Sequence, residues 1–295
     1  GKEIVRKMLA TADVVIENYR RGTMERLGLG YEVLRKANTG LIYCEISGFG
    51  RTGPYRDRSG FDLIAQGMSG LMSITGEGAG RPPVKVGAPV TDITAGILSA
   101  MGVLAAYIHR TKTGEGQRVD TSLYEAGITH TYWQSAMEFA MGCSPGAIGS
   151  AHPLTAPYQA FPTSDGWINI GAANQANWLK LLDVLDTPRI SDDPRFTNNK
   201  LRMENLKALI PLLNEVLVTR STTEWLDFLG EAGVPAGPIL GIGEMHRDPQ
   251  AVAREMVVQT THSKIGAVEA IGLPVKFSST ASDIKQGAPV LGEHS

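Results

Sequence analysis

The first 120 residues alternate short apolar strands with helical segments, and this alternation constrains the fold more than any other feature. Strands are predicted at residues 14–17, 41–47 and 117–120. Helices are predicted at residues 2–10, 31–37, 62–74 and 93–110. Strands that alternate with helices are typical of an α/β domain with a largely parallel sheet. We therefore predict an α/β fold for this half of the chain.

The second half has a different pattern. A long helix is predicted over 122–141, followed by a loop of Gly, Ser and Pro over 142–157. Beyond the loop we expect a strand at 167–171, helices at 177–185, 200–218 and 221–229, and strands within 257–277. Ser221 followed by Glu224 is a capping-box pattern for the third of these helices. These elements indicate a second, smaller α+β domain.

Charge and composition exclude several classes of protein. The 295 residues carry 28 Lys+Arg against 30 Asp+Glu, a balance that gives no case for nucleic acid or an anionic membrane as partner. No run approaches the roughly 18 apolar residues of a transmembrane helix, so none is expected. Cys44 and Cys143 lack metal-ligand spacing, and Cys44 is expected in the core. The six histidines show no metal-ligand spacing either, so no metal is predicted.

A glycine motif follows the second predicted strand. Residues 48–53, Gly-Phe-Gly-Arg-Thr-Gly, match the GxGxxG pattern of dinucleotide sites. That fingerprint requires the glycines to open a helix. Here a polar stretch follows, and the next helical pattern starts only near Phe61. The glycines are therefore predicted to shape a turn, which weakens the case for an NAD-dependent oxidoreductase.

Asp92 stands where an apolar helix begins. Ile93, Ile97, Met101, Leu104 and Ile108 form one stripe at helical spacing, which makes Asp92 or Thr91 the predicted N-cap. Capping alone would explain an aspartate there. The positive helix end would also hold a carboxylate ionised, as a nucleophile requires. Both interpretations of Asp92 stay open on the residues alone.

Two further groups are candidates for a site. Arg20, Arg21 and Arg26 follow the first strand, at the edge where open α/β sheets bind ligands, and arginine suits phosphate. A solvated basic loop is the alternative. His152 lies in the loop over 142–157, where it could act as a base, belong to a lid, or be an ordinary surface residue.

Several segments, in this order along the chain, resemble the class III CoA-transferase family, which also contains α-methylacyl-CoA racemases. The similar segments are residues 13–19, 26–29, 47–54, 60–66, 91–96, 112–117, 157–161 and 289–294, the last of which ends at His294. The family normally has an additional first strand–turn–helix segment and further C-terminal helices. The chain opens with Gly1 inside a helix-like run, so we expect N-terminal sequence to be missing.

The resemblance implies a site and its ligand. It assigns Asp92 as the catalytic nucleophile and coenzyme A or acyl-CoA as the substrate, with no permanently bound cofactor. The implied CoA-contacting residues are Asn18, Tyr19, Arg20, Arg26, Ser59, Gly60, Phe61 and Asp62. A cytoplasmic enzyme in a reducing compartment is expected.

The resemblance also implies an architecture. The family fold is a ring made of a Rossmann-like large domain with a parallel sheet, a smaller α+β domain and two linkers, and two rings interlock into a homodimer. On this chain we expect the large CoA-binding domain at 1–122, a linker helix and loop at 123–155, the small domain at 156–250 and a returning linker at 251–295.

The implied reaction moves CoA from an acyl-CoA donor, with succinyl-CoA expected, to a small acid through an aspartyl anhydride and an aspartyl-CoA thioester. Residues 149–153 resemble the branch that uses dicarboxylates. The racemase branch has a histidine where this chain has Phe61, and a phenyl ring cannot carry a proton. Phe61 therefore favours transfer over racemisation. A non-catalytic acyl-CoA-binding protein is the remaining alternative.

Overall fold

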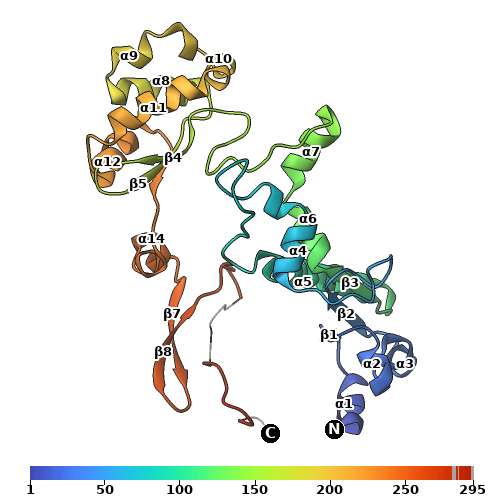
Figure 1. The fold of residues 1–295 in the computed structure, drawn as a ribbon. Coiled ribbons are helices and arrows are strands. Elements are labelled where there is room, and N and C mark those ends of the chain that lie inside the picture. The colour runs from blue at the N-terminus through green and yellow to red at the C-terminus, as the bar shows by residue number, and fades with distance from the viewer. Residues whose placement is uncertain (281–283, 285, 294–295) are drawn as a thin grey trace. The chain divides into compact units, whose positions relative to one another are not determined.

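The computed structural model describes residues 1–280, 284 and 286–293. The chain divides into two compact units, Gly1–Leu154 and Thr155–Ser295, each of which is described by itself (Figure 1). His294, the end of the last similar segment, lies outside the described residues.

The first unit is built on a parallel sheet in the order β1-β2-β3. Its strands are β1 (Val14–Glu17), β2 (Ile42–Ser47) and β3 (Arg118–Ser122). The central strand β2 is buried on both faces, as expected of a parallel sheet covered by helices. Cys44 has no exposed surface, which confirms its place in the core. The α/β prediction for this half is confirmed.

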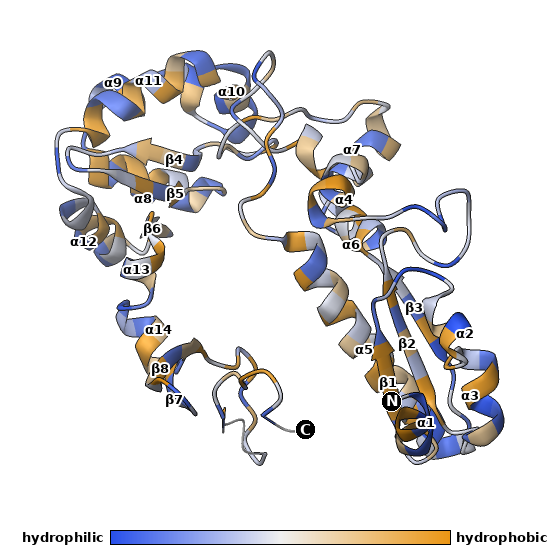
Figure 2. Ribbon diagram, turned by 60° about the horizontal axis from the view of Figure 1, so that its bottom comes forward, coloured by the Kyte–Doolittle hydropathy of each residue, from blue (hydrophilic) through white to orange (hydrophobic). Residues whose placement is uncertain are grey.

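Helices cover the two faces of this sheet. On one face Tyr43 packs with Met24 and Leu34 of the short helices that follow β1. The opposite face is covered by α5, whose small residues Ala95 and Ala106 are buried against β2 and β3 (Figure 2). The helices of the unit are α1 (Lys2–Leu9), α2 (Thr23–Leu27), α3 (Tyr31–Ala37), α4 (Asp62–Met68), the 3₁₀ helix η1 (Leu71–Ser73), α5 (Val90–Thr113), α6 (Leu123–Thr129) and α7 (Tyr132–Met141).

The predicted apolar stripe of α5 lies on its exposed face. Ile93, Ile97, Met101, Leu104 and Ile108 are all more than half exposed. Gly102 lies on the packed side, where a β-carbon would come within 2.7 Å of Val119. By length and composition alone α5 could cross a membrane, but one such helix is weak evidence, because a helix of a packed core passes the same test. Here it is instead one layer of the α/β unit.

Three predicted helices are interrupted in the structure. The helix expected over 62–74 breaks at Gly70, whose φ of 87° is left-handed, and separates α4 from η1. The helix expected over 122–141 breaks at His130 and Thr131 into α6 and α7. The helix expected over 200–218 breaks at Asn205 into α10 and α11. Apolar periodicity continues through each break, which is why the pattern did not reveal it.

The second unit holds an antiparallel sheet in the order β4-β5-β6 with helices packed on it. Trp178, Trp225, Leu209 and Leu213 are almost fully buried in one continuous core. The capping box of Ser221 is present, as predicted. The elements are β4 (Tyr158–Pro162), β5 (Trp167–Gly171), α8 (Gln175–Leu185), α9 (Pro188–Ser191), η2 (Pro194–Phe196), α10 (Asn199–Glu204), α11 (Leu206–Leu217), α12 (Thr222–Ala232), β6 (Ala236–Pro238), α13 (Ile242–Met245) and α14 (Pro249–Ala253).

A β-hairpin follows in the same unit. Strands β7 (Val257–His262) and β8 (Gly266–Ile271) pair antiparallel, so the strands predicted within 257–277 are present up to Ile271. The short strand β6 was not predicted, because the sequence there is a run of glycine and proline that reads as a breaker.

Candidate functional site

The turn after β1 forms the first wall of the site. Glu17 ends the strand, and its Oε2 accepts a 2.7 Å hydrogen bond from the Tyr19 backbone amide, which shapes the turn. Gly22 then adopts a φ of 80°, a conformation that suits a residue without a β-carbon. Arg26 follows on α2, and its Nη2 donates a 2.9 Å hydrogen bond to Thr23 Oγ1. The carboxyl edge of β1 therefore presents a series of basic side chains.

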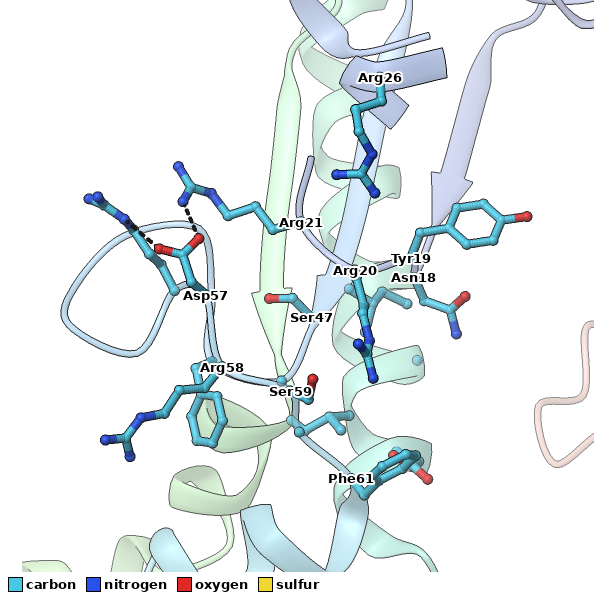
Figure 3. A pocket seen from close by; sticks show the side chains of 18 residues that line it. Asn18, Tyr19, Arg20, Arg21, Arg26, Ser47, Asp57, Arg58, Ser59 and Phe61 are labelled. Atoms are coloured by element: carbon cyan, nitrogen blue, oxygen red, sulfur yellow. Dashed lines mark hydrogen bonds and ion pairs between the residues drawn. The ribbon is translucent and has the colours of Figure 1, made fainter. Parts of the chain in front are cut away.

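A closed loop over residues 48–60, which we call the arginine loop, forms the second wall. Its two ends touch: a β-carbon at Gly60 would lie 2.6 Å from Gly48 Cα, so neither glycine can be replaced without moving the backbone. Near its tip, Asp57 Oδ1 lies 2.5 Å from Arg21 Nη1 (Figure 3). This ion pair connects the loop to the turn after β1.

The arginine loop contains the GxGxxG motif and settles its role. Gly50 and Gly53 have φ values of 84° and 78° inside the loop, and the next helix begins only at Asp62. The motif therefore shapes a turn, as predicted, because no helix N-terminus follows the glycines to receive a pyrophosphate.

The third wall is the first turn of α5. The helix is capped at Pro89, so the prediction that Asp92 or Thr91 is the N-cap is wrong. The N-cap residue of α5 makes no capping hydrogen bond with its side chain, and Asp62 takes this role from outside the helix. Asp62 Oδ1 accepts hydrogen bonds from Thr91 N at 3.0 Å and from Thr91 Oγ1 at 2.8 Å. A carboxylate from α4 thus satisfies the free amide of α5. Asp92 lies in the first turn without serving as the cap.

These three walls surround a pocket of about 760 Å³ within the first unit. Eight of the nine candidate residues line it: Asn18, Tyr19, Arg20, Arg26, Ser59, Gly60, Phe61 and Asp92. Asp62 does not line the pocket, because its carboxylate is held by Thr91 and by Gln66 Nε2 at 2.8 Å. The structure brings together residues that are up to 74 positions apart in the sequence.

The pocket is strongly basic. Arg20, Arg21, Arg26, Arg56 and Arg58 line it, against two carboxylates, Asp57 and Asp92. One of these carboxylates is paired, since Asp57 contacts both Arg21 and Arg56. Several guanidinium groups around one cavity suit a ligand that carries more than one phosphate.

Asp92 and Asp62 have opposite pKa shifts. Partial burial, and then the negative charge of Asp62, raise the pKa of Asp92. This is contrary to the expectation that the helix end would favour its ionised form. For Asp62, desolvation acts to raise the pKa, but the hydrogen bonds from Thr91 and Gln66 lower it overall. The two carboxyl groups therefore differ in charge over an acidic range of pH.

Some lining residues were missed by sequence reasoning. Arg56 and Arg58 lie in a polar stretch with no motif, and only the closed loop brings them to the pocket. Gly96 was not missed, because it belongs to the similar segment over 91–96; it lies one helical turn after Asp92, lines the pocket and has open space beside it. His152 is not among the lining residues; its ring packs edge-on against Trp133 at 4.9 Å. Within residues 1–280, 284 and 286–293, no group of acidic, Cys or His side chains could hold a metal ion.

Comparison with known proteins gives the context of this site. The model of "CoA-transferase family III" matches residues 1–295. The chain is 38% identical to the "Succinate--glutarate CoA-transferase" of Agrobacterium fabrum over all of its length and 73% of that protein. It is 34% identical to the "Succinyl-CoA:glutarate CoA-transferase" of Homo sapiens, over all of its own length and 67% of that protein. It is 38% identical to an "Acyl-CoA transferase" of Fusarium pseudograminearum, over all of its own length and 65% of that protein. The chain thus spans about two thirds to three quarters of the length of these relatives.

Solved structures of similar proteins have the same fold as this chain. A CAIB/BAIF family protein from Brucella suis superimposes with a TM-score of 0.88 at 39% identity, covering the whole of this chain and 76% of that one. The Rv3272 protein of Mycobacterium tuberculosis has a TM-score of 0.87 at 27% identity, over 99% of this chain and 78% of that one. Three findings agree: the family model matches the full length, similar proteins are named as CoA-transferases, and the fold is shared. This chain belongs to CoA-transferase family III.

Proposed function

We propose that this protein is a CoA-transferase that moves coenzyme A from an acyl-CoA donor to a small carboxylic acid, with Asp92 as the nucleophile. The observation that carries the proposal is the Asp92 carboxylate in an arginine-lined pocket at the carboxyl edge of the sheet. The arginines suit the phosphates of CoA, and Asp92 suits attack on the thioester at the other end of the ligand. The fold and family match support the same reaction class.

The proposed reaction preserves the energy of the thioester by forming two covalent intermediates. Asp92 Oδ attacks the donor thioester carbonyl, and CoA thiolate leaves as an aspartyl mixed anhydride forms. The thiolate then attacks the aspartyl carbonyl, which frees the donor acid and leaves an aspartyl-CoA thioester. The acceptor carboxylate attacks this thioester to give a second anhydride. The returning thiolate attacks its acceptor carbonyl, which forms the new acyl-CoA and restores the Asp92 carboxylate.

The environment of Asp92 fits these steps. Asp92 is exposed, so an incoming thioester can reach it, and desolvation still raises its pKa. Both intermediates hydrolyse readily, so the bound substrates have to exclude water from the carboxylate. Gly96 and the glycines of the arginine loop provide backbone close to the pocket, where amide groups could stabilise the oxyanions. Phe61 offers no proton, which favours transfer over two-base racemisation.

We further propose succinyl-CoA as donor and a dicarboxylate as acceptor. Several similar proteins are named for succinyl-CoA together with glutarate, mesaconate or D-citramalate. A cytoplasmic homodimer completes the proposal. The exposed apolar stripe of α5 supports association, because large apolar patches on a protein surface usually mark a contact. Light scattering that reports only a monomer would contradict the dimer.

An isotope experiment tests the covalent role of Asp92. The protein is incubated with succinyl-CoA and a panel of acids whose carboxylates carry heavy oxygen, and the CoA esters and the peptide that contains Asp92 are analysed by mass spectrometry. The mechanism requires one acceptor oxygen to remain on Asp92 after turnover. New acyl-CoA without label on Asp92 would refute the aspartyl route. If no acid gives a new CoA ester, the protein is not a transferase for these acids, and the remaining alternatives are an acyl-CoA-binding protein and a racemase.

A further inference from the structure

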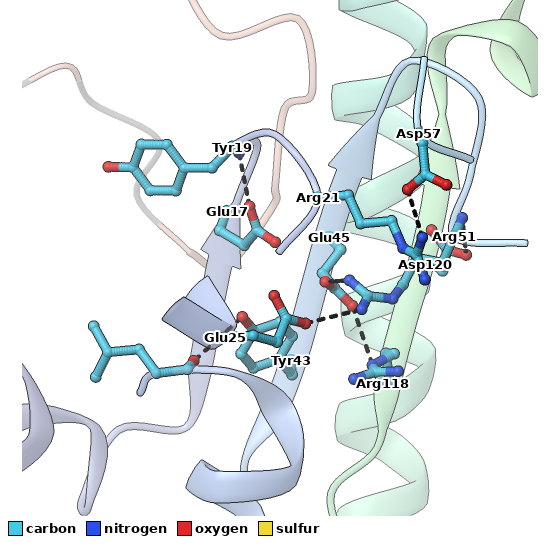
Figure 4. A network of polar contacts seen from close by, with 11 residues as sticks. Glu17, Tyr19, Arg21, Glu25, Tyr43, Glu45, Arg51, Asp57, Arg118 and Asp120 are labelled. Carbon is cyan, nitrogen blue, oxygen red and sulfur yellow. Dashed lines mark hydrogen bonds and ion pairs between the residues drawn. The ribbon is translucent and has the colours of Figure 1, made fainter. Parts of the chain in front are cut away.

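A group of charges surrounds the buried carboxylate of Glu45 and takes no part in the proposed reaction. Glu45, in the middle of β2, has only 3% of its side chain exposed. Its carboxylate forms ion pairs with Arg51 of the arginine loop and with Arg118 of β3 (Figure 4). Burying a carboxylate is costly unless it is paired, so both arginines are needed to keep it charged there.

Arg51 is the hub of this group because it reaches three elements at once. One guanidinium nitrogen contacts Glu45, and Nη2 lies 3.0 Å from Glu25 Oε1 on α2. Its backbone amide donates a 3.1 Å hydrogen bond to Asp120 Oδ2 on β3. By contrast, Arg118 Nε lies 3.1 Å from Glu45 without hydrogen-bond alignment, so that contact is chiefly electrostatic. Arg51 thus connects the arginine loop with the sheet and with α2.

The elements that Arg51 joins are those that carry the pocket arginines. The arginine loop holds Arg56 and Arg58, and α2 holds Arg26 immediately after Glu25. Arg51 itself does not line the pocket. At its neck the loop is also held by the close approach of Gly48 and Gly60, by hydrogen bonds from the Gly50 amide to Ser47 Oγ and from the Tyr124 amide to the Gly48 carbonyl, and by the Phe49 ring against Tyr124. Near its tip, the ion pair between Arg21 and Asp57 joins exposed side chains and contributes little in water. The ion pair that ties the loop to a buried carboxylate is the one between Arg51 and Glu45.

We propose that Arg51, held by Glu45 and Glu25, is a positioning residue that fixes the arginine loop and α2 in one arrangement able to bind the phosphates of the CoA substrate. This inference rests on the proposed function for the identity of the ligand. The planar guanidinium is essential to the role, because a lysine ammonium cannot make the two-sided contact with Glu45 and Glu25.

The test compares Arg51→Lys and Arg51→Ala with Arg189→Ala, which breaks an exposed ion pair to Glu215 in the second unit. Positioning predicts that both Arg51 variants raise the Kd for CoA by on the order of ten-fold, as for coupled neighbours. A long-range effect of charge alone would instead be rescued by lysine, and that result would overturn the proposal. Arg189→Ala should leave the Kd unchanged.

A second readout does not depend on the ligand. Hydrogen exchange of the amides over 48–60 should become faster in Arg51→Lys, while exchange in β2 stays slow, if Arg51 fixes the loop. Unchanged exchange in the loop would overturn the inference even where CoA binds well. If the unmodified protein fails to bind CoA, the proposed function fails, yet faster loop exchange in the variant would still support the role of Arg51.

The loss of CoA affinity caused by Arg51→Lys should depend on the arginines of the loop. If Arg51 acts by positioning Arg58, then Arg51→Lys should weaken CoA binding much less in a protein that already carries Arg58→Ala. Full additivity of the two changes would show that Arg51 acts independently of the loop and would overturn the proposal.

Discussion

Each unit contains an arginine that is held inside the fold, Arg202 in the second unit and Arg51 in the first, and the two arginines have different partners. In the second unit Arg202 is fully buried, and its guanidinium donates hydrogen bonds to the carbonyls of Ala156 at 2.6 Å and Phe196 at 3.2 Å. Burial lowers the pKa of Arg202 to about 10. In the first unit Arg51 is instead paired with carboxylates beside an open pocket. Arg202 ties a core together, whereas Arg51 is proposed to support the arginine loop beside the pocket.

Their apolar side chains differ in the same way. The second unit encloses Trp178, Trp225 and Leu213 in one core, whereas α5 of the first unit exposes Met101 and Leu104. The larger apolar core therefore lies in the second unit, where close packing contributes most to stability. The pocket lined by charged side chains lies in the first unit. Changes in the first unit should alter function, and changes in the second should alter the free energy of unfolding.

The largest expected effect is the loss of the nucleophile. Asp92→Asn keeps the shape of the side chain but cannot form the anhydride, so acyl exchange should fall by about four orders of magnitude or more, as when a covalent nucleophile is removed. The melting temperature should change little, because Asp92 does not cap α5. Exchange is measured by transfer of labelled acid into acyl-CoA. Activity that survives in Asp92→Asn would remove Asp92 from the mechanism.

The next effect concerns packing. Leu213→Ala in the second unit should lower the free energy of unfolding by about 2–5 kcal/mol, because the side chain is fully buried. Leu104→Ala on the exposed face of α5 is the matched control, and at a protein concentration low enough to keep the chain monomeric it should change this free energy by less than about 0.5 kcal/mol. Denaturant titration measures both. An equally large loss for Leu104→Ala would show that this face of α5 is covered in solution, and would remove the contrast between the units.

A smaller effect is expected from one phosphate-binding arginine. Arg26→Ala should weaken CoA binding by roughly 1.5–3 kcal/mol, the range for hydrogen bonds to charged groups. The rate of acyl exchange at saturating acyl-CoA should change less, because Arg26 lies on α2 and Asp92 on α5. Calorimetry gives the Kd, and Arg189→Ala in the second unit serves as the control. An unchanged Kd would remove Arg26 from the site.

The sequence predicted the fold class, and eight of its candidate site residues are among those that line the pocket, because both depend on local pattern or on strand order. Strand–helix alternation placed Arg20 and Arg26 at the carboxyl edge of the sheet, where they lie. The order of similar segments assigned Phe61 and Asp92 to the same site, and both line the pocket.

What escaped prediction depends on contacts between distant residues. The cap of α5 comes from Asp62, which is 29 positions before Thr91, so no local rule could have found it. The hub at Arg51 requires the partners Glu25, Glu45 and Asp120 from three separate elements. Spacing rules describe neighbours along a helix or strand, whereas these contacts form only after the chain has folded.

The smallest predicted effect concerns pH. In the proposed mechanism Asp92 reacts as a carboxylate, and its raised pKa then predicts that activity is lost, as pH falls, at a higher pH than for an ordinary aspartate near 3.9. Asp62 has a lowered pKa and is therefore still charged in that range. In Asp62→Asn this like charge is absent, so the pKa of Asp92 should fall and the acid limb of the activity profile should move to lower pH.

A matched control exists in the second unit. Asp165 holds Thr222 as Asp62 holds Thr91, since its Oδ1 accepts hydrogen bonds from Thr222 N at 2.8 Å and Thr222 Oγ1 at 3.0 Å. Asp165→Asn should cost similar stability yet leave the acid limb where it is, because the charge of Asp165 is not among the causes of the raised pKa of Asp92. If both variants move the limb equally, the shift reflects a general change in stability and not the charge of Asp62. If neither moves it, burial alone sets the pKa of Asp92, and the carboxylate of Asp62 serves only to hold the start of α5.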